Sequence, residues 1–515
     1  MTGRISDQLL ARCDEVITAR FGLHFPKKRR SDLERGLVRA AGDLGFDDPD
    51  AFISLLLTAQ LTKEQSDALV SHLTIGETYF FREKNCFDAL RMHILPLLLD
   101  SRRGGEKRLR IWCAGCSTGE EPYSVAILLH RMIPDLAKWN VTILATDINP
   151  VSLRKGIQGE YSDWSFRETP RWLKDNYFTA NGKGRYAISE AIMKMVTFAP
   201  FNLAQDPYPA LSSNTNAMDI IFCRNVLMYF APEQAKGAIA RFRHSLLDGG
   251  WLIVSPCESS HVLFADFATV TLNNTILYRK DYHQEESPPA PILQKGEIIA
   301  PATLSQMREV TPPTPLLQRG EVSTFPATAP NPVQDAPPVS QYDDALLSYH
   351  RGEYAEAAVK LAGFLTNIPQ GETSSVYGKA AALLTQAYAN QGNLTLALEW
   401  SEKAVAADKL NPLPYYLQAT IFQEQGVDDA AAVSLRTAIY LDHGFVLAHF
   451  ALANLAMRRG KHKEAARHLE NAASFLHAYG DNDLLPGSDG MSARRLAEII
   501  NATRGSIVAG KGRWE

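Results

Sequence analysis

The stretch Leu109-Arg110-Ile111-Trp112-Cys113-Ala114-Gly115-Cys116-Ser117-Thr118-Gly119-Glu120-Glu121-Pro122 decides the fold of this chain. A short apolar run, Leu109–Cys113, ends in a loop of small residues. An amphipathic pattern typical of a helix follows through His130. A strand, a small-residue loop and a helix in this order form the first unit of a nucleotide-type cofactor site in an open parallel sheet, because glycines let the backbone approach a ligand.

Further strands are predicted downstream: Val141–Thr146, ending at Asp147; Asp219–Cys223, ending at Arg224-Asn225; and Trp251–Ser255, after the turn Gly249-Gly250. A carboxylate at the end of the next strand, here Asp147, can accept hydrogen bonds from both ribose hydroxyls. Glu120 and Glu121 argue against a phosphate at the helix start, because an anion would meet two carboxylates there. A cationic sulfonium that carries an amino acid fits better, which favours S-adenosylmethionine over NAD or ATP.

Composition indicates a soluble multidomain chain. At roughly 100–200 residues per domain, 515 residues predict two to four domains. The formal net charge of -4 gives no general attraction to nucleic acid, and six cysteines are too few for a disulfide scaffold. No apolar stretch reaches the ~18 residues of a membrane helix, and the first twelve residues do not resemble a signal peptide. We therefore expect a cytoplasmic protein with no nucleic-acid partner and no direct membrane insertion.

Two changes in pattern divide the chain. Residues 284–340 hold 12 of the 28 prolines and are predicted to form an extended linker. Beyond it, Gly352, Gly392, Gly426 and Gly460 are spaced by 40, 34 and 34 residues, and each is followed five residues later by alanine. A period of 34 is typical of tetratricopeptide repeats, which are stacked pairs of antiparallel helices. We expect these repeats at 341–480, with an insertion around Pro369–Thr373.

The repeats predict a binding role and no chemistry. The concave face of such a stack usually binds a peptide or a partner domain, but the sequence does not identify this ligand. Residues 481–515 are predicted to hold a capping helix, Ser492–Ala502, and a frayed end, Gly505–Glu515.

The first 85 residues show helical spacing of apolar residues and are predicted to form a small all-α domain. Its second predicted helix is preceded and lined by basic residues: Lys27, Lys28, Arg29, Arg30, Arg35 and Arg39. A run of charge is by default a solvated helix face, and the alternative is a docking surface for an acidic partner.

Five motifs in order carry a family resemblance: Thr78–Arg82, Trp112–Ser124, Ala145–Ile148, Phe201–Leu203 and Ile221–Phe230. Together they closely resemble the CheR-type chemoreceptor glutamate methyltransferases, over about residues 1–282. The resemblance implies a helical receptor-docking domain at 1–85. It also implies a class I, Rossmann-like α/β methyltransferase domain at 86–283, with a small β-subdomain inserted at about 177–198. The repeats would follow as a separate all-α solenoid.

The resemblance also implies functional residues. The positions that match the family's cofactor contacts are Thr78, Arg82, Glu120, Asp147, Asn202, Leu203, Arg224 and Asn225. Whether Glu120 or the adjacent Glu121 makes the contact is open, and we favour Glu120. Arg82, Arg224 and Tyr229 are the candidates for catalysis, near the carboxylate of the cofactor or of the acceptor. Tyr229 has a packed core tyrosine as its alternative. Under the resemblance, the basic residues become a docking surface for receptor helices.

The implied reaction transfers a methyl group from S-adenosylmethionine to a receptor glutamate and leaves S-adenosylhomocysteine. A glutamate with an ordinary pKa of roughly 4.3 is already ionised at neutral pH, so positioning and partial desolvation supply the catalysis. The loop Ala180–Gly184 looks short for capture of a receptor's C-terminal pentapeptide, which favours pentapeptide-independent recognition. The sequence Ser255–Glu258 departs from the Gly-His-Ser-Glu that is common in the family.

Alternatives to this function remain open. The domain could methylate another carboxylate or a small molecule, or it could be a scaffold that binds the cofactor without turnover. Cys113 and Cys116 have the spacing of a metal or redox pair, but no second Cys/His pair accompanies them. We therefore expect no metal site.

Overall fold

The computed structural model describes residues 5–182, 184–281, 341–367 and 374–511. The predicted linker at 284–340 and the insertion Pro369–Thr373 lie outside these described residues. The described residues on the two sides of the linker belong to one compact unit, so the contacts between them are part of the fold. Among the helices that the structure describes, none combines the length and the apolar character that crossing a membrane requires.

The predicted all-α domain forms at the N-terminus. It contains α1 (Asp7–Phe21), a 3-10 turn at Lys27–Arg29, α2 (Arg30–Asp43), α3 (Pro49–Thr58) and α4 (Lys63–Leu73). Ser6 caps α1 by accepting a hydrogen bond from the Leu9 amide, and Thr62 and Gln65 form a capping box at α4. Ile17, Leu33 and Phe52 are fully buried between the helices.

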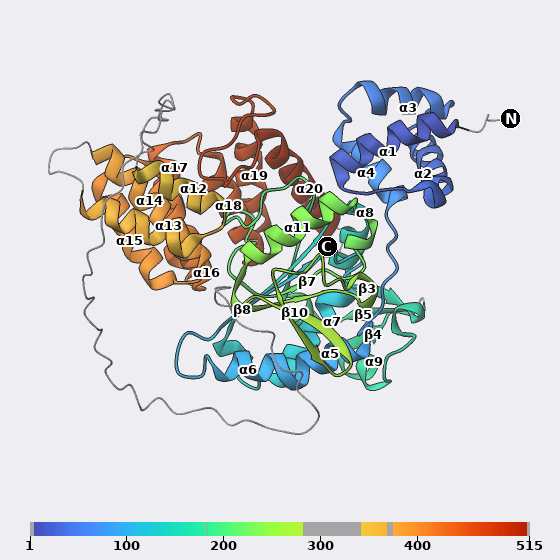
Figure 1. The fold of residues 1–515 in the computed structure, drawn as a ribbon, viewed down its shortest axis with the longest axis horizontal. Helices are drawn as coiled ribbons and strands as arrows, with labels where there is room; N and C mark the ends of the chain where they lie inside the picture. Colours follow the sequence, from blue (N-terminus) through green and yellow to red (C-terminus); the bar gives the residue numbers. More distant parts are fainter. Residues whose placement is uncertain (1–4, 183, 282–340, 368–373, 512–515) are drawn as a thin grey trace, which may run out of the picture. The chain divides into compact units, whose positions relative to one another are not determined.

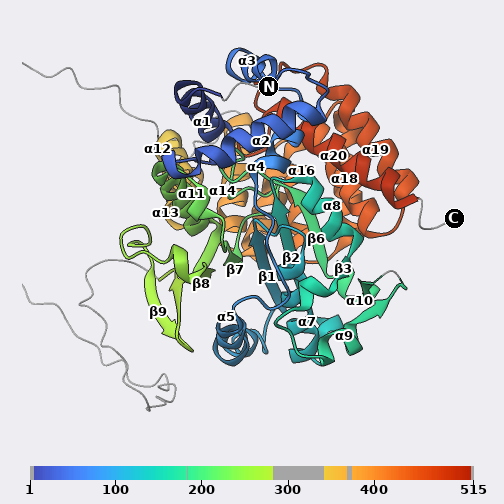
Figure 2. The same cartoon turned by 90° about the vertical axis from the view of Figure 1, so that its right-hand side faces the viewer.

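A seven-stranded sheet forms the centre of the predicted methyltransferase domain, in the order β6-β2-β1-β7-β8-β10-β9. In Figure 2 the labels β6, β2, β1, β7, β8 and β9 follow this order across the sheet. The strands are β1 (Arg108–Ala114), β2 (Asn140–Asp147), β6 (Val196–Pro200), β7 (Met218–Phe222), β8 (Leu246–Ile253), β9 (Ala268–Leu272) and β10 (Thr275–Arg279). The first five strands of the order run parallel, and β10 is antiparallel to β8 and β9. All four strands predicted from the sequence are present, and β8 begins five residues earlier than predicted.

Helices cover both faces of this sheet, as its near-continuous apolar strands require. Around the sheet lie α5 (Lys84–Ala89), α6 (Leu95–Asp100), α7 (Glu120–Met132), α8 (Pro150–Gln158) and α11 (Pro232–Ser245) (Figure 1). Alternate residues of β1 enter different core clusters. Ile111 packs with residues of α5 and α7, and Trp112 packs with Phe242 of α11. The carboxyl ends of the parallel strands therefore meet at one edge, where the loops after β1, β2 and β7 come together.

The β-subdomain has different limits from those predicted. It is a three-stranded antiparallel sheet of β3 (Glu160–Ser162), β5 (Arg185–Ile188) and β4 (Phe178–Ala180), with α9 (Trp172–Tyr177) before β4 and α10 (Glu190–Met193) after β5. The subdomain thus begins at Glu160, well before 177. Its predicted last residues, 196–198, belong to β6, because they pair in parallel register with β2 in the main sheet.

The predicted repeats form four pairs of antiparallel helices, which we call the array. The pairs are α12 (Gln341–His350) with α13 (Tyr354–Thr366), α14 (Ser374–Asn390) with α15 (Leu394–Ala407), α16 (Pro412–Glu424) with α17 (Asp428–Leu441), and α18 (Val446–Arg458) with α19 (His462–Leu476). The four repeat glycines end the first helix of each pair with φ between 70° and 77°, the left-handed region that favours glycine. The alanines five residues later are all fully buried, which permits close contact between the helices.

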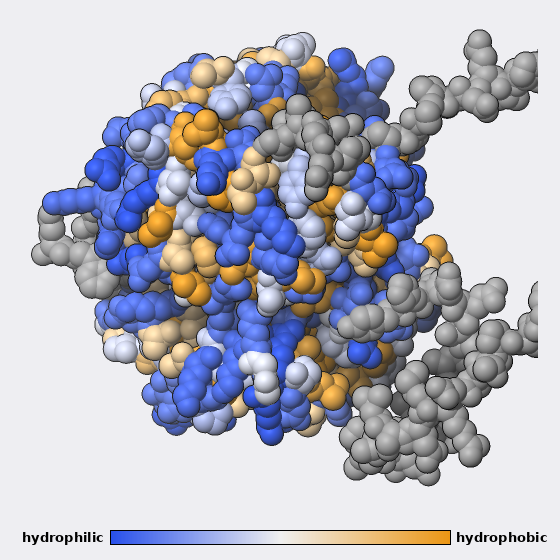
Figure 3. All heavy atoms as spheres, turned by 90° about the vertical axis from the view of Figure 1, so that its left-hand side faces the viewer, coloured by the Kyte–Doolittle hydropathy of each residue, from blue (hydrophilic) through white to orange (hydrophobic). Residues whose placement is uncertain are grey.

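The C-terminal helix α20 (Ala493–Lys511) is longer than predicted. Residues 505–511, expected to be frayed, continue the helix. On the face of the molecule drawn in Figure 3, the described hydrophobic residues occur in small separate groups among hydrophilic ones.

The array packs against the amino-terminal ends of the sheet strands, opposite the edge where the loops meet. The turns at Gly392 and Gly426 are two of the contacts. A Cβ at Gly392 would lie 2.8 Å from Nη2 of Arg108, at the start of β1. A Cβ at Gly426 would lie 3.4 Å from Nδ2 of Asn140, at the start of β2. Glycine serves the left-handed conformation at both turns, and at Gly392 it also allows the close approach of the two domains, whereas the space at Gly426 would admit a Cβ.

One carboxylate from the array is buried at this junction. Glu424, at the end of α16, lies 3.1 Å from Nη1 of Arg108 and 3.8 Å from Nη1 of Arg110. It also accepts a hydrogen bond of 2.8 Å from Nδ2 of Asn216. All four residues are less than 9% exposed. The charge of Glu424 is therefore matched by buried partners on the methyltransferase domain, as a buried carboxylate requires.

The inner face of the array contacts other segments of the same chain. The first helices α12, α14 and α16 lie next to one another along this face. Asp489, from the loop before α20, accepts hydrogen bonds from Tyr349 on α12 and from Gln386 on α14. The Asp489 carboxylate also accepts the Leu211 amide of the methyltransferase domain, and the Leu211 side chain is buried in the array's core cluster. This surface, expected to hold an unknown ligand, is here partly covered by the chain's own loops.

Candidate cofactor and methyl-transfer site

The loop after β1 comes close to two other backbone segments because it contains glycine. Gly115 has φ +81°, and a Cβ there would lie 2.3 Å from Cγ2 of Val226. Gly119 has φ +92°, and a Cβ there would lie 3.1 Å from Cα of Gly156. The amides of Gly115 and Cys116 donate to the Thr146 carbonyl, which ties this loop to the end of β2. Any side chain at either glycine would push the loop out of place.

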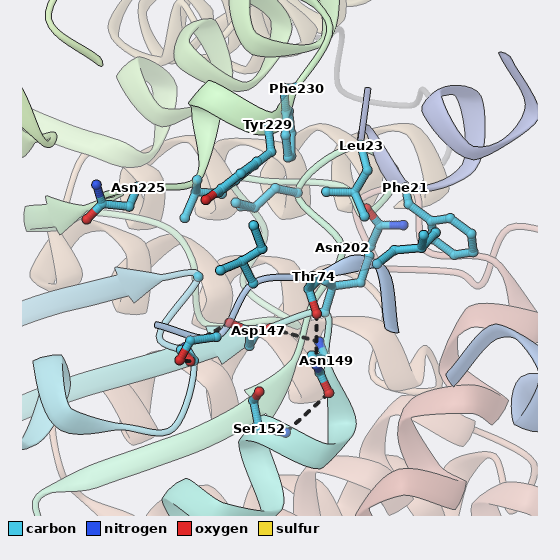
Figure 4. Close-up of a pocket in the computed structure, with 18 of the residues that line it drawn as sticks. Phe21, Leu23, Thr74, Asp147, Asn149, Ser152, Asn202, Asn225, Tyr229 and Phe230 are labelled. Carbon is cyan, nitrogen blue, oxygen red and sulfur yellow. Dashed lines mark hydrogen bonds between the residues drawn. The ribbon is translucent and has the colours of Figure 1, made fainter. Parts of the chain in front are cut away.

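Asp147 ends β2 and lines a cleft at the edge of the sheet, which we call the Asp147 cleft (Figure 4). One carboxylate oxygen accepts the Ser117 amide and the other the Asn149 amide, both at 2.8 Å. Burial raises the pKa of Asp147, and these backbone hydrogen bonds oppose that rise. The carboxylate is thereby fixed in direction at the position predicted for the ribose hydroxyls.

The far wall of the Asp147 cleft contains Asn202 and Leu203, from the loop after β6. Nδ2 of Asn202 donates to the Arg20 carbonyl of the N-terminal domain at 2.8 Å, and its Oδ1 accepts the Ala204 amide. The N-terminal domain adds apolar residues that the sequence analysis did not identify: Phe21, Leu23 and Phe25. No local signal marks them, because only the packing of the two domains brings them to the cofactor edge.

A second cleft adjoins the first and is lined by Thr78, Arg82, Glu121 and Arg224; we call it the Arg82 cleft. Asn225 and Tyr229 line both clefts. The second cleft carries charged groups, whereas apolar side chains dominate the first. The two clefts together can hold a molecule with an apolar aromatic end and a charged amino-acid end.

The structure separates the two adjacent glutamates. Glu120 is buried, and its carboxylate accepts hydrogen bonds from Thr118 at 2.6 Å and from Ser165 at 2.9 Å. It lines neither cleft. Glu121 lines the Arg82 cleft and pairs with Nη1 of Arg224 at 2.8 Å. Burial raises the pKa of Glu121, and Arg224 opposes the rise. Contact with the cofactor through Glu120, the choice favoured from the sequence, does not agree with this placement, whereas contact through Glu121 does.

Arg224 is buried within the site, and its guanidinium is bound by other groups of the protein. Besides Glu121, it pairs with Glu83 at 3.0 Å and donates to the Arg82 carbonyl at 2.6 Å. Arg82 itself donates to the Glu77 carbonyl and lies over the Tyr79 ring, 5.9 Å from its centroid. Arg224 is thus held by carboxylates of the protein, and Arg82 is the more exposed arginine of the cleft.

Glu258 holds the loop that carries Asn225. Its two carboxylate oxygens accept the amides of Asn225 at 2.7 Å, Val226 at 2.8 Å, Met228 at 3.2 Å and Ser255 at 3.1 Å. Asn225 has φ +58°, so these bonds stabilise a strained turn. The segment Ser255–Glu258 departs from the family pattern, yet its glutamate has a clear positioning role.

The predicted docking residues fall into two groups. Lys27, Lys28, Arg35 and Arg39 are exposed. Arg29 instead lines the Asp147 cleft, with its guanidinium 5.0 Å from the centroid of the Tyr229 ring. Arg30 is half-buried and donates to the Asp7 carbonyl. Tyr229 is half-buried and lines both clefts, so it is neither free in solvent nor enclosed in the core.

The cysteine pair is buried within the cofactor loop. Burial raises the pKa of both Cys113 and Cys116, which disfavours the reactive thiolate. Within the described residues, no group of three or more His, Cys, Asp and Glu side chains is arranged to hold a metal ion.

The fold and the site define a methyltransferase of the S-adenosylmethionine-dependent class. Residues 76–274 match the family model described as CheR methyltransferase, SAM binding domain. The chain is 30% identical over 257 residues to a chemotaxis protein methyltransferase of Borreliella burgdorferi, covering 50% of this chain and 89% of the relative. It is 36% identical over 208 residues to one of Listeria monocytogenes, covering 40% and 74%. It is 29% identical over 280 residues to chemotaxis protein methyltransferase 2 of Vibrio cholerae, covering 54% and 94%.

The chain therefore belongs to the CheR methyltransferase family, and its cofactor is S-adenosylmethionine. The site fits this cofactor on three structural grounds. The loop at Gly115 has no room for a side chain, Asp147 presents a fixed acceptor for hydroxyl groups, and Glu121 places a carboxylate in the cleft that would receive the cationic end.

Proposed function

We propose that this protein transfers the methyl group of S-adenosylmethionine to glutamate side chains of chemoreceptors, in the cytoplasm. The observation that carries the proposal is the pair of joined clefts in a CheR family chain: one is largely apolar and contains Asp147, and the other is charged and contains Arg82. The relatives named as chemotaxis protein methyltransferases support chemoreceptors as the substrate class.

The residues of this chain would act by holding two oppositely charged reactants in line. Asp147 would bind the ribose hydroxyls, and Asn202 and Leu203 would frame the adenine. When bound, the cofactor supplies an electrophilic methyl group on a sulfonium. Glu121 would lie near the positively charged end; burial raises its pKa, and Arg224 opposes that rise. Arg82 would orient the acceptor glutamate or the carboxylate of the cofactor, together with Tyr229. The acceptor is ionised at neutral pH, so no general base is required.

The exposed basic residues support a docking role for the N-terminal domain. Lys27, Lys28, Arg35 and Arg39 present positive charge to solvent, which suits receptor helices rich in acidic residues. Replacing Lys27 and Lys28 by glutamate should raise the KM for the receptor and leave the Kd for S-adenosylhomocysteine unchanged. Replacing Arg29 should alter the Kd as well, because Arg29 lines the cofactor cleft. Equal KM values for the Lys27/Lys28 variant and the wild type would remove the docking role of these lysines.

The test of the reaction is incubation of the full chain with a methyl-labelled donor and cytoplasmic fragments of receptors. Base-labile label on receptor glutamates would support the proposal, because a carboxylate methyl ester hydrolyses in base. Label on another acceptor would identify a different methyltransferase. Cofactor binding without any label would identify a scaffold.

A further inference from the structure

The cofactor cleft has walls from two domains, so its width depends on how these domains are held together. Asn202 and Leu203 come from the methyltransferase domain, and Phe21 and Leu23 come from the N-terminal domain. The described hydrogen bonds across the cleft include the one from Nδ2 of Asn202 to the Arg20 carbonyl.

The methyltransferase wall is a tight turn that Asp206 stabilises. Its carboxylate accepts the Asn202 amide at 2.6 Å, and its own amide donates to the Asn202 carbonyl at 2.8 Å. Asp206 is 2% exposed, so its charge needs a buried partner.

That partner comes from the C-terminal helix. Arg495 on α20 donates through Nη2 to one carboxylate oxygen of Asp206 at 2.7 Å, and its Nε lies 2.5 Å from the other oxygen as a charge contact. A charge-assisted hydrogen bond of this kind is stronger than a neutral one. The backbone of Asn202 is therefore held in place by a residue that lies beyond the repeats.

The adjacent arginine contacts the other wall. Arg494 donates through Nη2 to the Leu61 carbonyl at 3.1 Å and through Nη1 to Oε1 of Gln60, both in the N-terminal domain. Directly beside this contact, Arg20 donates to the Ala59 carbonyl at 2.9 Å. The segment that Arg494 holds is thus bonded to Arg20, the neighbour of Phe21 at the end of α1.

A second cavity lies between α20 and the cofactor cleft. Arg494 and Arg495 line it, together with residues of both walls. Phe21, Ile148, Phe201 and Asn202 line this cavity and also the Asp147 cleft, so they form the partition between the two. A movement of α20 would therefore remove contacts from the side of the partition that faces away from the cofactor cleft.

The array sets the position of α20. Leu496 and Ile500 of α20 are fully buried in the core cluster of the array. The loop before α20 is bonded to two repeats through Asp489.

We propose that Arg494 and Arg495 are positioning residues for cofactor binding, through which the helical array holds the two walls of the cofactor cleft at their working separation. A partner that displaced the array would then weaken cofactor binding without touching the cleft. This inference rests on the Asp147 cleft being the cofactor site, and it does not depend on which acceptor is methylated.

The test measures S-adenosylhomocysteine binding to the full chain by titration calorimetry, with no acceptor present. We expect Arg495→Ala to raise the Kd about tenfold and Arg494→Ala to raise it about threefold, within the usual range of coupling between sites. Arg495→Lys should restore part of the loss. Arg504→Ala is the matched control, because Arg504 lies on the same helix and pairs with Glu470 of the array. Its Kd should equal that of the wild type.

The outcomes are distinct. The inference would be overturned if the Arg495 and Arg494 variants both bound S-adenosylhomocysteine with a Kd within twofold of the wild-type value. Their melting temperatures would also have to be unchanged. No binding by the wild type would overturn the site assignment instead.

A measurement on the wild type keeps the inference testable if Arg495→Ala does not fold. Coupling is reciprocal, so bound S-adenosylhomocysteine should slow amide hydrogen exchange in the first turns of α20 as well as in the turn at 202–206. Slower exchange at 202–206 alone would refute the coupling.

Discussion

Removing the Glu424 carboxylate should release the array from the methyltransferase domain. Glu424→Ala leaves Arg108 and Arg110 without their buried anionic partner at the junction. At the 3.1 Å separation from Arg108, and with an effective dielectric of about 20, the attraction is about 5 kcal/mol before desolvation. Burial lowers the pKa of Arg110, and Glu424 opposes this, so the loss of Glu424 destabilises the charged guanidinium. Breaking one side of a buried pair costs about 3–5 kcal/mol.

Hydrogen exchange is the suitable assay because unfolding of a multidomain chain is not two-state. The Leu211 amide donates a hydrogen bond to Asp489 across the junction. Exchange in the segment 208–216 therefore reports the opening of the junction. Exchange there should become about 10²–10³ times faster in Glu424→Ala, since each 1.4 kcal/mol corresponds to a factor of ten.

Two further variants separate charge from packing. Glu399→Ala removes an exposed carboxylate that pairs with Lys403 within one helix, and it should change exchange at 208–216 by less than a few-fold. Arg108→Met combined with Glu424→Met should recover only the part of the loss that comes from Arg108, because apolar residues can replace a buried ion pair but Arg110 still lacks its anion. Wild-type exchange in Glu424→Ala would refute the reasoning, since it would mean that the two arginines need no anion.

Three further outcomes are expected. Asp147→Ala should weaken cofactor binding at least about tenfold, because charge-assisted hydrogen bonds are lost; calorimetry with an unchanged Kd would remove Asp147 from the site. Glu121→Gln should weaken binding more than Glu120→Gln in the same assay, and the reverse order would restore the sequence-based choice. Burial raises the pKa of Asp489 from 3.8 to about 6, so the charged form of Asp489 is destabilised in the folded protein. Its contribution to stability is therefore greatest below about pH 4 and falls as the pH rises through 6, by up to about 3 kcal/mol. Asp489→Asn should remove this part of the pH dependence of hydrogen exchange at 208–216, after correction for the intrinsic exchange rate.

Local patterns were sufficient to predict much of the fold. The apolar run before Gly115 and the acidic residue at the end of the next strand predicted the parallel sheet and its cofactor edge. The spacing of the repeat glycines predicted helix pairs, and these glycines end the first helices as expected. These predictions succeeded because period, turn chemistry and strand-end residues depend on neighbours in the sequence.

Sequence patterns were insufficient where a choice depends on distant partners. Two adjacent glutamates look alike in sequence, but the direction of α7 turns Glu120 toward Ser165 and Glu121 toward Arg224. The limits of the β-subdomain depended on residues 196–198 pairing with β2 in the main sheet. Arg29 resembled its basic neighbours until the N-terminal domain placed it over Tyr229.

The sequence by itself determined the family, the cofactor class and the order of the domains, because short motifs encode the turns and charges that a sulfonium cofactor needs. Only the tertiary structure decided what the repeats contact. Asp206 and Arg495 are 289 residues apart. Nothing local in either segment indicates that one neutralises the other, because a buried charge is matched by whichever group the fold brings to it.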